Sequence, residues 1–165
     1  MENKLSSFDK SNIAVIVMDV DGTLTDGTIN IGDNGEVFKA FYCRDGLGIK
    51  MVQKRGIRVV ILTSRMSELV LFRAKELGIE DVIQNAVDDK YTLLKEYMKE
   101  HELSPEQVAY IGDDINDLEA MSLCGLVGCP SDAVDKVKKI ADYISCHFGG
   151  KGAVREFVDW IISEQ

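Results

Sequence analysis

Residues 13–27 read IAVIVMDVDGTLTDG, an apolar run that leads into two aspartates, Asp19 and Asp21, only two positions apart. Carboxylates this close repel each other, and each raises the pKa of the other unless a cation or a reaction partner compensates. The pattern therefore predicts a compensating positive charge at the end of this run. One carboxylate acting as a nucleophile and one transferring a proton are a workable pair for phosphoryl transfer.

Polar side chains also follow three other short apolar runs. They are Thr63, Ser64 and Arg65 after the second run, Asp88, Asp89 and Lys90 after the third, and Asp113, Asp114, Asn116 and Asp117 after the fourth. In open parallel sheets ligands bind at the carboxyl ends of the strands, so four such strands would bring these groups to one edge. So many carboxylates at one edge predict a hard divalent cation, and Mg²⁺ with oxygen ligands fits best.

The residue types in this set suggest individual roles. Asp19 can offer one oxygen to the metal and one to a substrate, and Asp21 lies on the same side of the chain, where it can transfer a proton. Thr63 with its neighbouring backbone N–H groups, and Lys90, can hold phosphoryl oxygens where negative charge accumulates.

The elements that must position these residues are short strands that alternate with amphipathic helices. Strands are predicted over 13–18, 58–62, 82–84, 108–111 and 126–128, and helices over 46–55, 67–77, 89–100, 116–124 and 132–140. Residues 104–107, SPEQ, are typical of a capped turn. The alternation predicts an α/β fold with a mostly parallel sheet that is covered on both faces.

One segment interrupts the alternation. Residues 28–41, TINIGDNGEVFKAF, are predicted to form a β-hairpin around the turn 32–35, inserted after the first strand. Residues 149–165 form a tail in which the glycine-rich GGKGA precedes an amphipathic helix. Because the sequence contains no repeat, low-complexity tract or linker, we expect one domain over 1–165, long enough to bury a core.

Composition restricts the class of protein and its location. The net charge of −9 disfavours a surface for nucleic acid or anionic membranes, although a local cation can still attract a small anionic substrate. The four cysteines show no C-x-x-C pair and no zinc-like spacing, so free thiols in a reducing compartment are expected. The polar start of the chain and the short apolar runs predict a cytoplasmic protein without a membrane span.

Other motifs explain only parts of the pattern. D-x-D-G-T also begins like an EF-hand loop, but the positions that need glycine and glutamate hold Leu24 and Asn30. Residues 149–153, GGKGA, lack the glycine spacing and the Ser/Thr of a Walker loop. Taken alone, Thr63 is more often a turn residue and Lys90 a solvated helix charge. The ordered placement of all four groups at strand ends favours a functional site.

The four groups together resemble the haloacid dehalogenase-like superfamily of aspartate-dependent phosphotransferases. The matching segments are DVDGT (19–23), LT (62–63), Lys90 and GDDIND (112–117), in the order of the four family motifs. The resemblance covers nearly the whole chain. It implies a three-layer, doubly wound parallel sheet and dependence on Mg²⁺.

The resemblance also implies a role for each matching residue. Asp19 would be the nucleophile that becomes an aspartyl-phosphate, and Asp21 would protonate the leaving alcohol, then deprotonate water, and lend its backbone carbonyl to Mg²⁺. Thr63 and Lys90 would bind the phosphoryl group. Of the remaining acids, one would ligate the metal directly and two would act through water or by orienting the lysine. These are Asp113 for the first role and Asp114 and Asp117 for the second.

The spacing of the motifs leaves no room for a cap domain, because only the hairpin and one helix separate Asp21 from Thr63. A capless site is open to water, so either the substrate is large or another subunit supplies the lid. DGTLTDG, the hairpin, RDGLGI (44–49) and GGKGAVRE (149–156) resemble the small capless sugar-acid phosphatases. These act on 3-deoxy-D-manno-octulosonate 8-phosphate or on nine-carbon 2-keto-3-deoxy relatives, and they are typically homotetramers whose neighbouring subunits complete each site.

Several residues bear on the substrate. The second motif reads T-S-R here, where the octulosonate enzymes usually have T-G-R. Arg65 could pair with a substrate carboxylate as a planar fork, or be a surface charge. Ser64 keeps the backbone N–H of the usual glycine but adds a side chain that could crowd the phosphate. Arg155 and Lys151 could contact substrate or another subunit, or belong to a turn that starts the last helix. The same ambiguity applies to residues 44–45.

The sequence thus predicts a Mg²⁺-dependent phosphomonoesterase for a sugar-acid phosphate in bacterial surface-sugar (lipopolysaccharide) synthesis, with the eight-carbon acid favoured over a nine-carbon one. A signalling receiver domain would place its phosphoacceptor on a later strand, and it would leave GDDIND unexplained. A silent oligomerisation or regulatory subunit would not need to keep Asp19, Asp21 and Asp113 together. A nucleic-acid 3′-phosphatase is disfavoured by the acidic balance.

Overall fold

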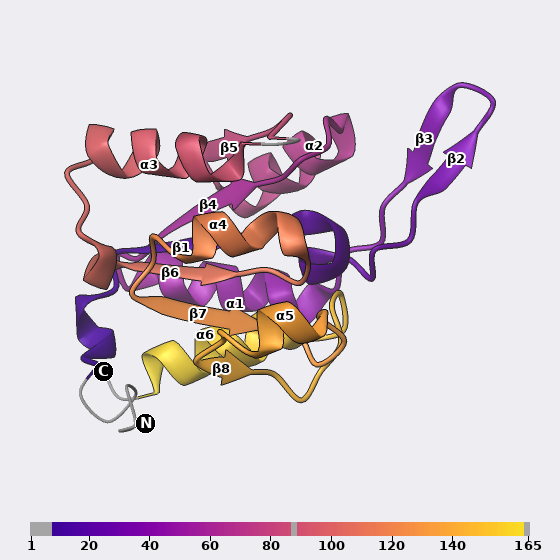
Figure 1. Cartoon of the computed structure of the whole chain (residues 1–165). Coiled ribbons are helices and arrows are strands. Elements are labelled where there is room, and N and C mark those ends of the chain that lie inside the picture. The colour runs from indigo at the N-terminus through magenta and orange to yellow at the C-terminus, as the bar shows by residue number, and fades with distance from the viewer. Residues whose placement is uncertain (1–7, 87–88, 164–165) are drawn as a thin grey trace.

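A six-stranded parallel sheet forms the centre of the computed structural model, which describes residues 8–86 and 89–163 (Figure 1). The strand order is β5-β4-β1-β6-β7-β8. The strands are β1 (Val15–Met18), β4 (Arg58–Leu62), β5 (Asp81–Ile83), β6 (Val108–Ile111), β7 (Leu126–Cys129) and β8 (Tyr143–Ile144). All five predicted strands are confirmed; β8 is too short for a periodic signal in the sequence.

The first strand lies at the point where the strand order reverses. On one side β1 pairs in parallel with β4, so that Met18 lies opposite Ile61. On the other side it pairs with β6, so that Met18 lies opposite Ile111. The chain builds outward from β1 in both directions, and the crevice at such a switch point is where open α/β sheets bind ligands. The residues that follow β1, β4 and β6 therefore share one edge.

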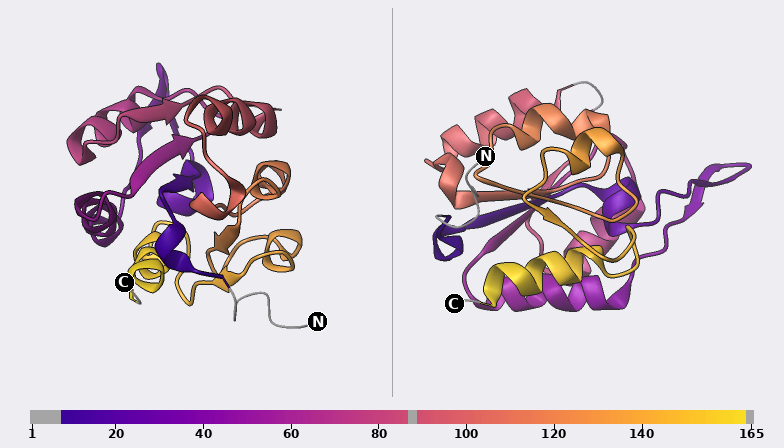
Figure 2. Two further views of the ribbon diagram at one scale, coloured as in Figure 1. Left: turned by 90° about the vertical axis from the view of Figure 1, so that its left-hand side faces the viewer. Right: turned by 60° about the horizontal axis from the view of Figure 1, so that its bottom comes forward.

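Helices cover both faces of the sheet (Figure 2). One face carries α1 (Cys43–Lys54), α2 (Glu68–Leu77) and α6 (Ala153–Ile162), and the other carries α3 (Lys90–Glu100), α4 (Leu118–Met121) and α5 (Asp135–Lys138). The side chains of β1 alternate between the two hydrophobic cores: Ile16 and Met18 pack into one, Val15 and Val17 into the other. This confirms the predicted three-layer, doubly wound α/β fold.

The predicted helix boundaries are wrong in three places. The helix predicted over 116–124 is a 3₁₀ turn, η5 (Ile115–Asp117), followed by the short α4, and the one predicted over 132–140 covers only α5. Helix α1 begins three residues before its predicted start, and its two glycines serve close packing. A Cβ at Gly46 would lie 2.4 Å from the Arg73 side chain, and one at Gly48 would lie 3.1 Å from that of Arg155. Such packing overrides the low helix propensity of glycine.

Two short 3₁₀ turns complete the connections: η2 (Lys10–Asn12) before β1 and η4 (Pro105–Gln107) before β6. The predicted capped turn is confirmed, because Ser104 and Gln107 form a capping box around η4. In the part of the chain that the structure describes, no helix is both long and apolar enough to cross a membrane.

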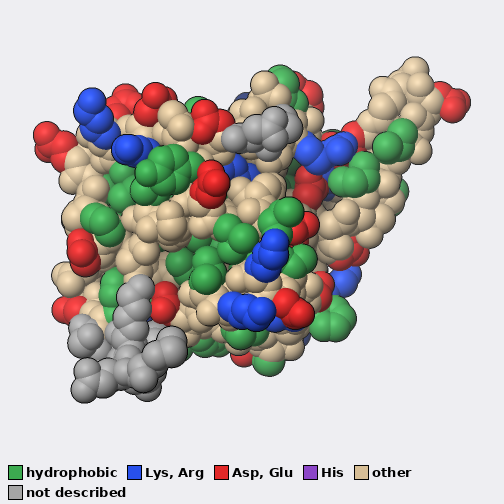
Figure 3. Space-filling model, viewed as in Figure 1, with side chains coloured by type: hydrophobic (Ala, Val, Ile, Leu, Met, Phe, Trp, Pro, Cys, Tyr) green, Lys and Arg blue, Asp and Glu red, His purple; other side chains and the backbone are tan. Residues whose placement is uncertain are grey.

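The predicted hairpin is confirmed and projects away from the sheet (Figure 1). Its strands, β2 (Asn30–Gly32) and β3 (Gly35–Phe38), pair antiparallel and form a separate two-stranded sheet. Hydrophobic side chains lie on the surface of this arm (Figure 3), where Ile31 is 73%, Val37 59% and Phe38 54% exposed. The hairpin and α1 are the only large elements between β1 and β4 in the described chain, so nothing there forms a cap.

Candidate active site

The chain turns sharply after β1, and the turn brings the first motif against the fourth. Residues Val20–Leu24 form a single irregular helical turn, η3, in which Gly22 has φ +104°. A Cβ at Gly22 would lie 2.1 Å from Oδ2 of Asp113, so only glycine allows this approach. The hydroxyl of Thr23 donates to Oδ1 of Asp113 at 3.0 Å. The turn therefore places Asp113 beside the end of the strand that carries Asp19.

A buried lysine joins two of the acids. Lys90, the first residue of α3, donates from Nζ to Oδ1 of Asp19 and to Oδ1 of Asp117, each at 2.6 Å. Lys90 is 2% exposed and Asp19 5%, so this ion pair is screened little by solvent. It is the compensating charge that the paired aspartates predict. Asp89 caps α3 through the N–H of Thr92, whereas Asp88 lies outside the described residues.

Both carboxylate oxygens of Asp117 are occupied by protein donors. Oδ1 also accepts from the hydroxyl of Tyr110 at 2.8 Å, and Oδ2 accepts from the backbone N–H groups of Asp113 and Asp114 at 3.1 and 3.3 Å. Asp117 therefore orients Lys90 and closes its own turn. Sequence reasoning missed Tyr110; a tyrosine inside a buried strand was the available signal, because its hydroxyl needs a partner there. Asp114 is exposed and caps η5 through the N–H of Ile115.

The acid cluster fits a divalent cation. One carboxylate oxygen from each of Asp19, Asp113 and Asp117 lies within 4.8 Å of the others. Burial, and then the charge of Asp117, raise the pKa of Asp19 well above its usual value, although Lys90 opposes this. Burial and Asp117 likewise raise the pKa of Asp113 to about 7. Among the described residues no donor reaches Oδ2 of Asp19 or of Asp113, so two hard oxygen atoms are left to ligate Mg²⁺.

Asp21 faces a different set of groups, which belongs to the hairpin stem. Lys39, just after β3, places Nζ 2.5 Å from Oδ1 of Asp21 and 2.9 Å from Glu36, and its side chain is 1% exposed. Glu36 in turn accepts from the hydroxyl of Ser67. Sequence reasoning missed Lys39, although it is the single lysine of residues 28–41. The inserted hairpin therefore supplies a cation to the second acid of the DVD motif.

The predicted substrate-binding residues of the second motif lie at the end of β4. Thr63 is 2% exposed, and its backbone is held by Ile83 and Ala86. The hydroxyl of Ser64 donates to the carbonyl of Ala86 at 3.1 Å and accepts from Asn116 Nδ2 at 3.2 Å. The side chain that replaces the usual glycine thus links the loops after three strands.

Arg65 stays close to the candidate site but is loosely held. Its Nε lies 3.7 Å from Oδ2 of Asp21, and its side chain is 47% exposed. Its planar guanidinium is therefore free to turn toward a bound anion beside Asp21.

The structure does not bring Arg155 to the acid cluster. Its Nε donates to Asp159 on the same helix at 2.8 Å, and Lys151 lies 3.8 Å from Asp26; no contact among the described residues joins either to Asp19. Asp45 is buried, and its Oδ1 accepts from the N–H of Arg155 at 2.8 Å, so it caps α6. Burial raises the pKa of Asp45. Residues 44–45 and the tail thus form one structural unit.

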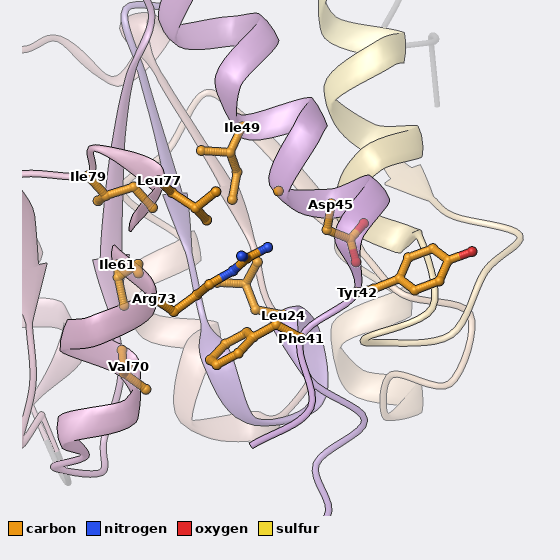
Figure 4. A pocket seen from close by; sticks show the side chains of 11 residues that line it. Leu24, Phe41, Tyr42, Asp45, Ile49, Ile61, Val70, Arg73, Leu77 and Ile79 are labelled. Atoms are coloured by element: carbon orange, nitrogen blue, oxygen red, sulfur yellow. The ribbon is translucent and has the colours of Figure 1, made fainter. Parts of the chain in front are cut away.

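A small enclosed cavity lies elsewhere, between α1 and α2 (Figure 4). Its volume is about 10 Å³, and apolar side chains such as Ile49, Ile61 and Leu77 line most of it. A space of this size holds about one water molecule, so it is not a substrate site.

Comparison with known proteins identifies the family. A sequence profile of haloacid dehalogenase-like hydrolases matches residues 79–154. The 3-deoxy-D-manno-octulosonate 8-phosphate phosphatase KdsC of Haemophilus influenzae (strain ATCC 51907 / DSM 11121 / KW20 / Rd) is 42% identical over 154 residues, which are 93% of this chain and 85% of that protein. The chain belongs to the haloacid dehalogenase-like hydrolases. The predicted family and enzyme class, a phosphoric monoester hydrolase, are confirmed.

Two solved structures of such hydrolases are close to this one. The 3-deoxy-D-manno-octulosonate 8-phosphate phosphatase from Moraxella catarrhalis, in complex with magnesium ion, phosphate ion and a KDO molecule, aligns with a TM-score of 0.93 at 39% identity, covering 100% of this chain and 94% of that one. The cobalt-bound Haemophilus influenzae enzyme aligns with a TM-score of 0.90 at 41% identity, covering 94% and 91%. Both relatives bind a divalent metal, as the acid cluster predicts here.

Proposed function

We propose that this haloacid dehalogenase-like hydrolase is a Mg²⁺-dependent phosphatase that converts 3-deoxy-D-manno-octulosonate 8-phosphate into KDO and phosphate. The main support for this proposal is the buried Asp19 at the end of β1. One of its oxygens is hydrogen-bonded to Lys90, and Asp113 lies beside it. Lys90 fixes the orientation of this carboxylate, and an oriented carboxylate at the metal position can act as a nucleophile. The likeness to phosphatases with this substrate supplies the identity of the sugar acid.

In the first half-reaction one carboxylate oxygen of Asp19 attacks the phosphorus atom, and the bond from phosphorus to the sugar oxygen breaks. Asp21 gives its proton to that oxygen, so the sugar leaves as an alcohol. Thr63 and Lys90 bind the phosphoryl oxygens while charge builds up on them.

In the second half-reaction the ionised Asp21 takes a proton from water, and the hydroxide attacks the aspartyl-phosphate. The bond between Asp19 and phosphorus breaks, which frees phosphate and restores both acids. Lys39, 2.5 Å from Asp21, holds this carboxylate in place between the two steps.

The metal would be held by Asp19, Asp113 and the backbone carbonyl of Asp21, with Asp114 and Asp117 around it. When bound, Mg²⁺ neutralises phosphoryl charge. The occupied oxygens of Asp117 support its role in orienting Lys90. For the substrate, Arg65 is exposed near Asp21 and is proposed to bind the sugar carboxylate as a fork, with Ser64 beside it. Arg155 is proposed to act at an intersubunit contact.

We further propose a cytoplasmic, single-domain protein over 1–165 that assembles into a homotetramer whose subunits complete each other's sites. Three exposed apolar side chains on the projecting hairpin support the assembly: Ile31, Val37 and Phe38. Such side chains on one arm are suited to packing against other copies of the chain. Substituting Phe38→Asp should lower the molar mass measured by light scattering, whereas Phe72→Asp, on a similarly exposed residue of α2, should not. An unchanged mass for Phe38→Asp would contradict the assembly through hairpins.

The first test is phosphate release, with and without Mg²⁺, from the octulosonate 8-phosphate, a nine-carbon keto-deoxy acid 9-phosphate and p-nitrophenyl phosphate. Strong preference for the first substrate supports the full proposal. Preference for the nine-carbon acid keeps the mechanism and changes the pathway. A folded, Mg²⁺-binding protein that releases no phosphate from any ester would contradict the proposal and favour a silent regulatory subunit.

A further inference from the structure

A cysteine, a histidine and a glutamate converge outside the candidate active site. One ligand atom from each of Cys146, His147 and Glu156 lies within 4.8 Å of the other two. Cys146 and His147 follow β8, whereas Glu156 lies in the first turn of α6. Sulfur, imidazole nitrogen and carboxylate oxygen are the donors that Zn²⁺ takes in proteins. Sequence spacing gave no sign of this group, because the fold brings its third member from ten residues away.

The carboxylate of Glu156 is already oriented. Its Oε2 accepts from the hydroxyl of Ser145 and, at 2.8 Å, from the backbone N–H of Cys146. Its Oε1 accepts from the thiol of Cys146 at 3.1 Å, so the two metal-ligating atoms lie side by side. Hydrogen bonds that orient a carboxylate are typical of ligands in metal sites, and an ion bound between Oε1 and Sγ would replace the thiol proton.

The segment that carries the other two donors is fixed at its backbone. The carbonyl of His147 accepts from the N–H of Ser131 at 2.9 Å, and the N–H of His147 donates to Ser145 Oγ at 3.0 Å. The imidazole lies at the start of α6, since a Cβ at Gly152 would be 3.6 Å from its Cδ2 atom. The backbone that carries two of the three ligand atoms is therefore held in place by hydrogen bonds.

The cluster is open to solvent and lies beside a groove. Cys146 and His147 are exposed and Glu156 is partly exposed, so an ion can reach all three. His147 and Glu156 line a groove of about 590 Å³ together with Arg44, Lys151 and Arg155. Three protein ligands leave a fourth position of a tetrahedral site open to water, and the groove beside it also contains Asp159, which pairs with Arg155.

We propose that Cys146, His147 and Glu156 form a second metal site, which takes a borderline-soft divalent ion such as Zn²⁺ in preference to Mg²⁺. The Cys146 S–H bond breaks, its proton goes to solvent, and the thiolate binds the ion. The donor set explains the selectivity, because Mg²⁺ prefers oxygen ligands and the acid cluster at Asp19 offers only these.

The site is also placed to restrain the catalytic turn. The loop that contains Cys146 and His147 continues to Gly150, whose N–H donates to the carbonyl of Thr23 at 2.9 Å. Binding an ion at the base of this loop should therefore raise the melting temperature of the whole chain, because the ion binds the folded state and holds β8, the loop and α6 together.

The test uses the full chain, stripped of metal with a chelator and titrated with Co²⁺ as a spectroscopic probe. Thiolate ligation gives a sulfur-to-cobalt charge-transfer band in the near ultraviolet, which an oxygen-only site cannot give. We expect this band in the wild type and in Asp113→Asn, which disrupts the acid cluster. Zn²⁺ should abolish the band, and Mg²⁺ should not.

Substitutions of single cysteines sharpen the test. Cys146→Ser should remove the band and weaken Zn²⁺ binding at least about tenfold, as loss of even an outer partner does at metal sites. Cys43→Ser, at the other exposed cysteine, is the matched control and should keep both properties. Circular dichroism checks that each variant is folded. A wild type that shows no band at saturating Co²⁺, or a Cys146→Ser variant that keeps it, would overturn the proposal. Neither result depends on which phosphate ester the enzyme hydrolyses.

Discussion

Asp19 and Asp21 are two positions apart, yet different parts of the molecule hold them. Asp19 is 5% exposed at the end of the central strand and accepts from Lys90 of α3, inside the layered core. Asp21 lies in the turn after β1 and pairs with Lys39 from the stem of the projecting hairpin. The proposed nucleophile is thus positioned by the core of the fold, and the proposed proton donor by an insertion.

This difference predicts two kinds of effect. Substitutions in the Lys90 network should lower both stability and activity, whereas substitutions beside Asp21 should act mainly on activity. Burial alone would lower the pKa of Lys90, but Asp19 and Asp117 outweigh this and raise it above its usual value. Removing Lys90 leaves two carboxylates inside the protein without their cation. The partners of Lys39 are more open to solvent, with side chains of Asp21 and Glu36 that are 17% and 16% exposed. Changes at Lys39 should therefore alter the reaction more than the folded state.

The largest expected effect comes from Asp19→Asn. We expect phosphate release to fall at least about 10⁴-fold, because losing a nucleophile costs at least this much in enzymes that act through one. The fold should persist, since the amide replaces one acid of a crowded cluster. Activity near the wild-type level would show that Asp19 is not the nucleophile, and circular dichroism would check the fold.

Lys90→Met should damage both activity and stability. It leaves Asp19 and Asp117 buried without their cation, which we expect to lower the free energy of unfolding by about 3–5 kcal/mol at neutral pH. Urea denaturation measures this loss, and it should shrink in acid, where the carboxyls are neutral. The control is Lys99→Met, on the exposed end of the same helix, which should change neither activity nor stability. A Lys90→Met variant as stable as the wild type would contradict the buried network.

Lys39→Met addresses the other half of the comparison. It removes the cation beside Asp21, and we expect phosphate release to fall about 10- to 100-fold. This is at most the lower limit of the about 10²- to 10⁴-fold that a positioned proton-transfer group contributes, because Asp21 itself remains. The urea midpoint should move much less than for Lys90→Met. A stability loss as large as that of Lys90→Met would mean that Lys39 stabilises the folded state as much as Lys90 does.

A pH trend in stability is expected for the metal-free protein. The pKa of Asp113 is about 7 in the folded chain and 3.8 in the unfolded one, so the folded state binds more protons between these values. The free energy of unfolding should therefore fall as the pH rises from about 4 to about 7 and then level off. Asp113→Asn should flatten this trend in urea melts, and Mg²⁺ should oppose it. A trend that Asp113→Asn leaves unchanged would mean that another group causes it.

Much of the fold was predictable because it depends on local patterns. The five strands and the hairpin follow from short apolar runs and turn residues, and four polar clusters at strand ends predict one shared edge. Tyr110 and Lys39 were not predictable in this way. Tyr110 fits the pattern of any core aromatic, because its bond to Asp117 depends on the turn that follows β6. Lys39 fits the pattern of a hairpin charge, because its partner Asp21 lies 18 residues away and meets it only in the fold.

The sequence by itself determined the family, the chemistry of the acid cluster and the order of the elements, since motif residues and periodicity are properties of short segments. Only the tertiary structure decided which partner each acid has. It separated Arg155 from the acid cluster, used Asp45 to cap α6, and joined Cys146 and His147 to Glu156. The physical reason is that hydrogen bonds and ion pairs depend on distances of a few ångströms, which the packing of β1, α3, α6 and the hairpin sets and no local spacing contains.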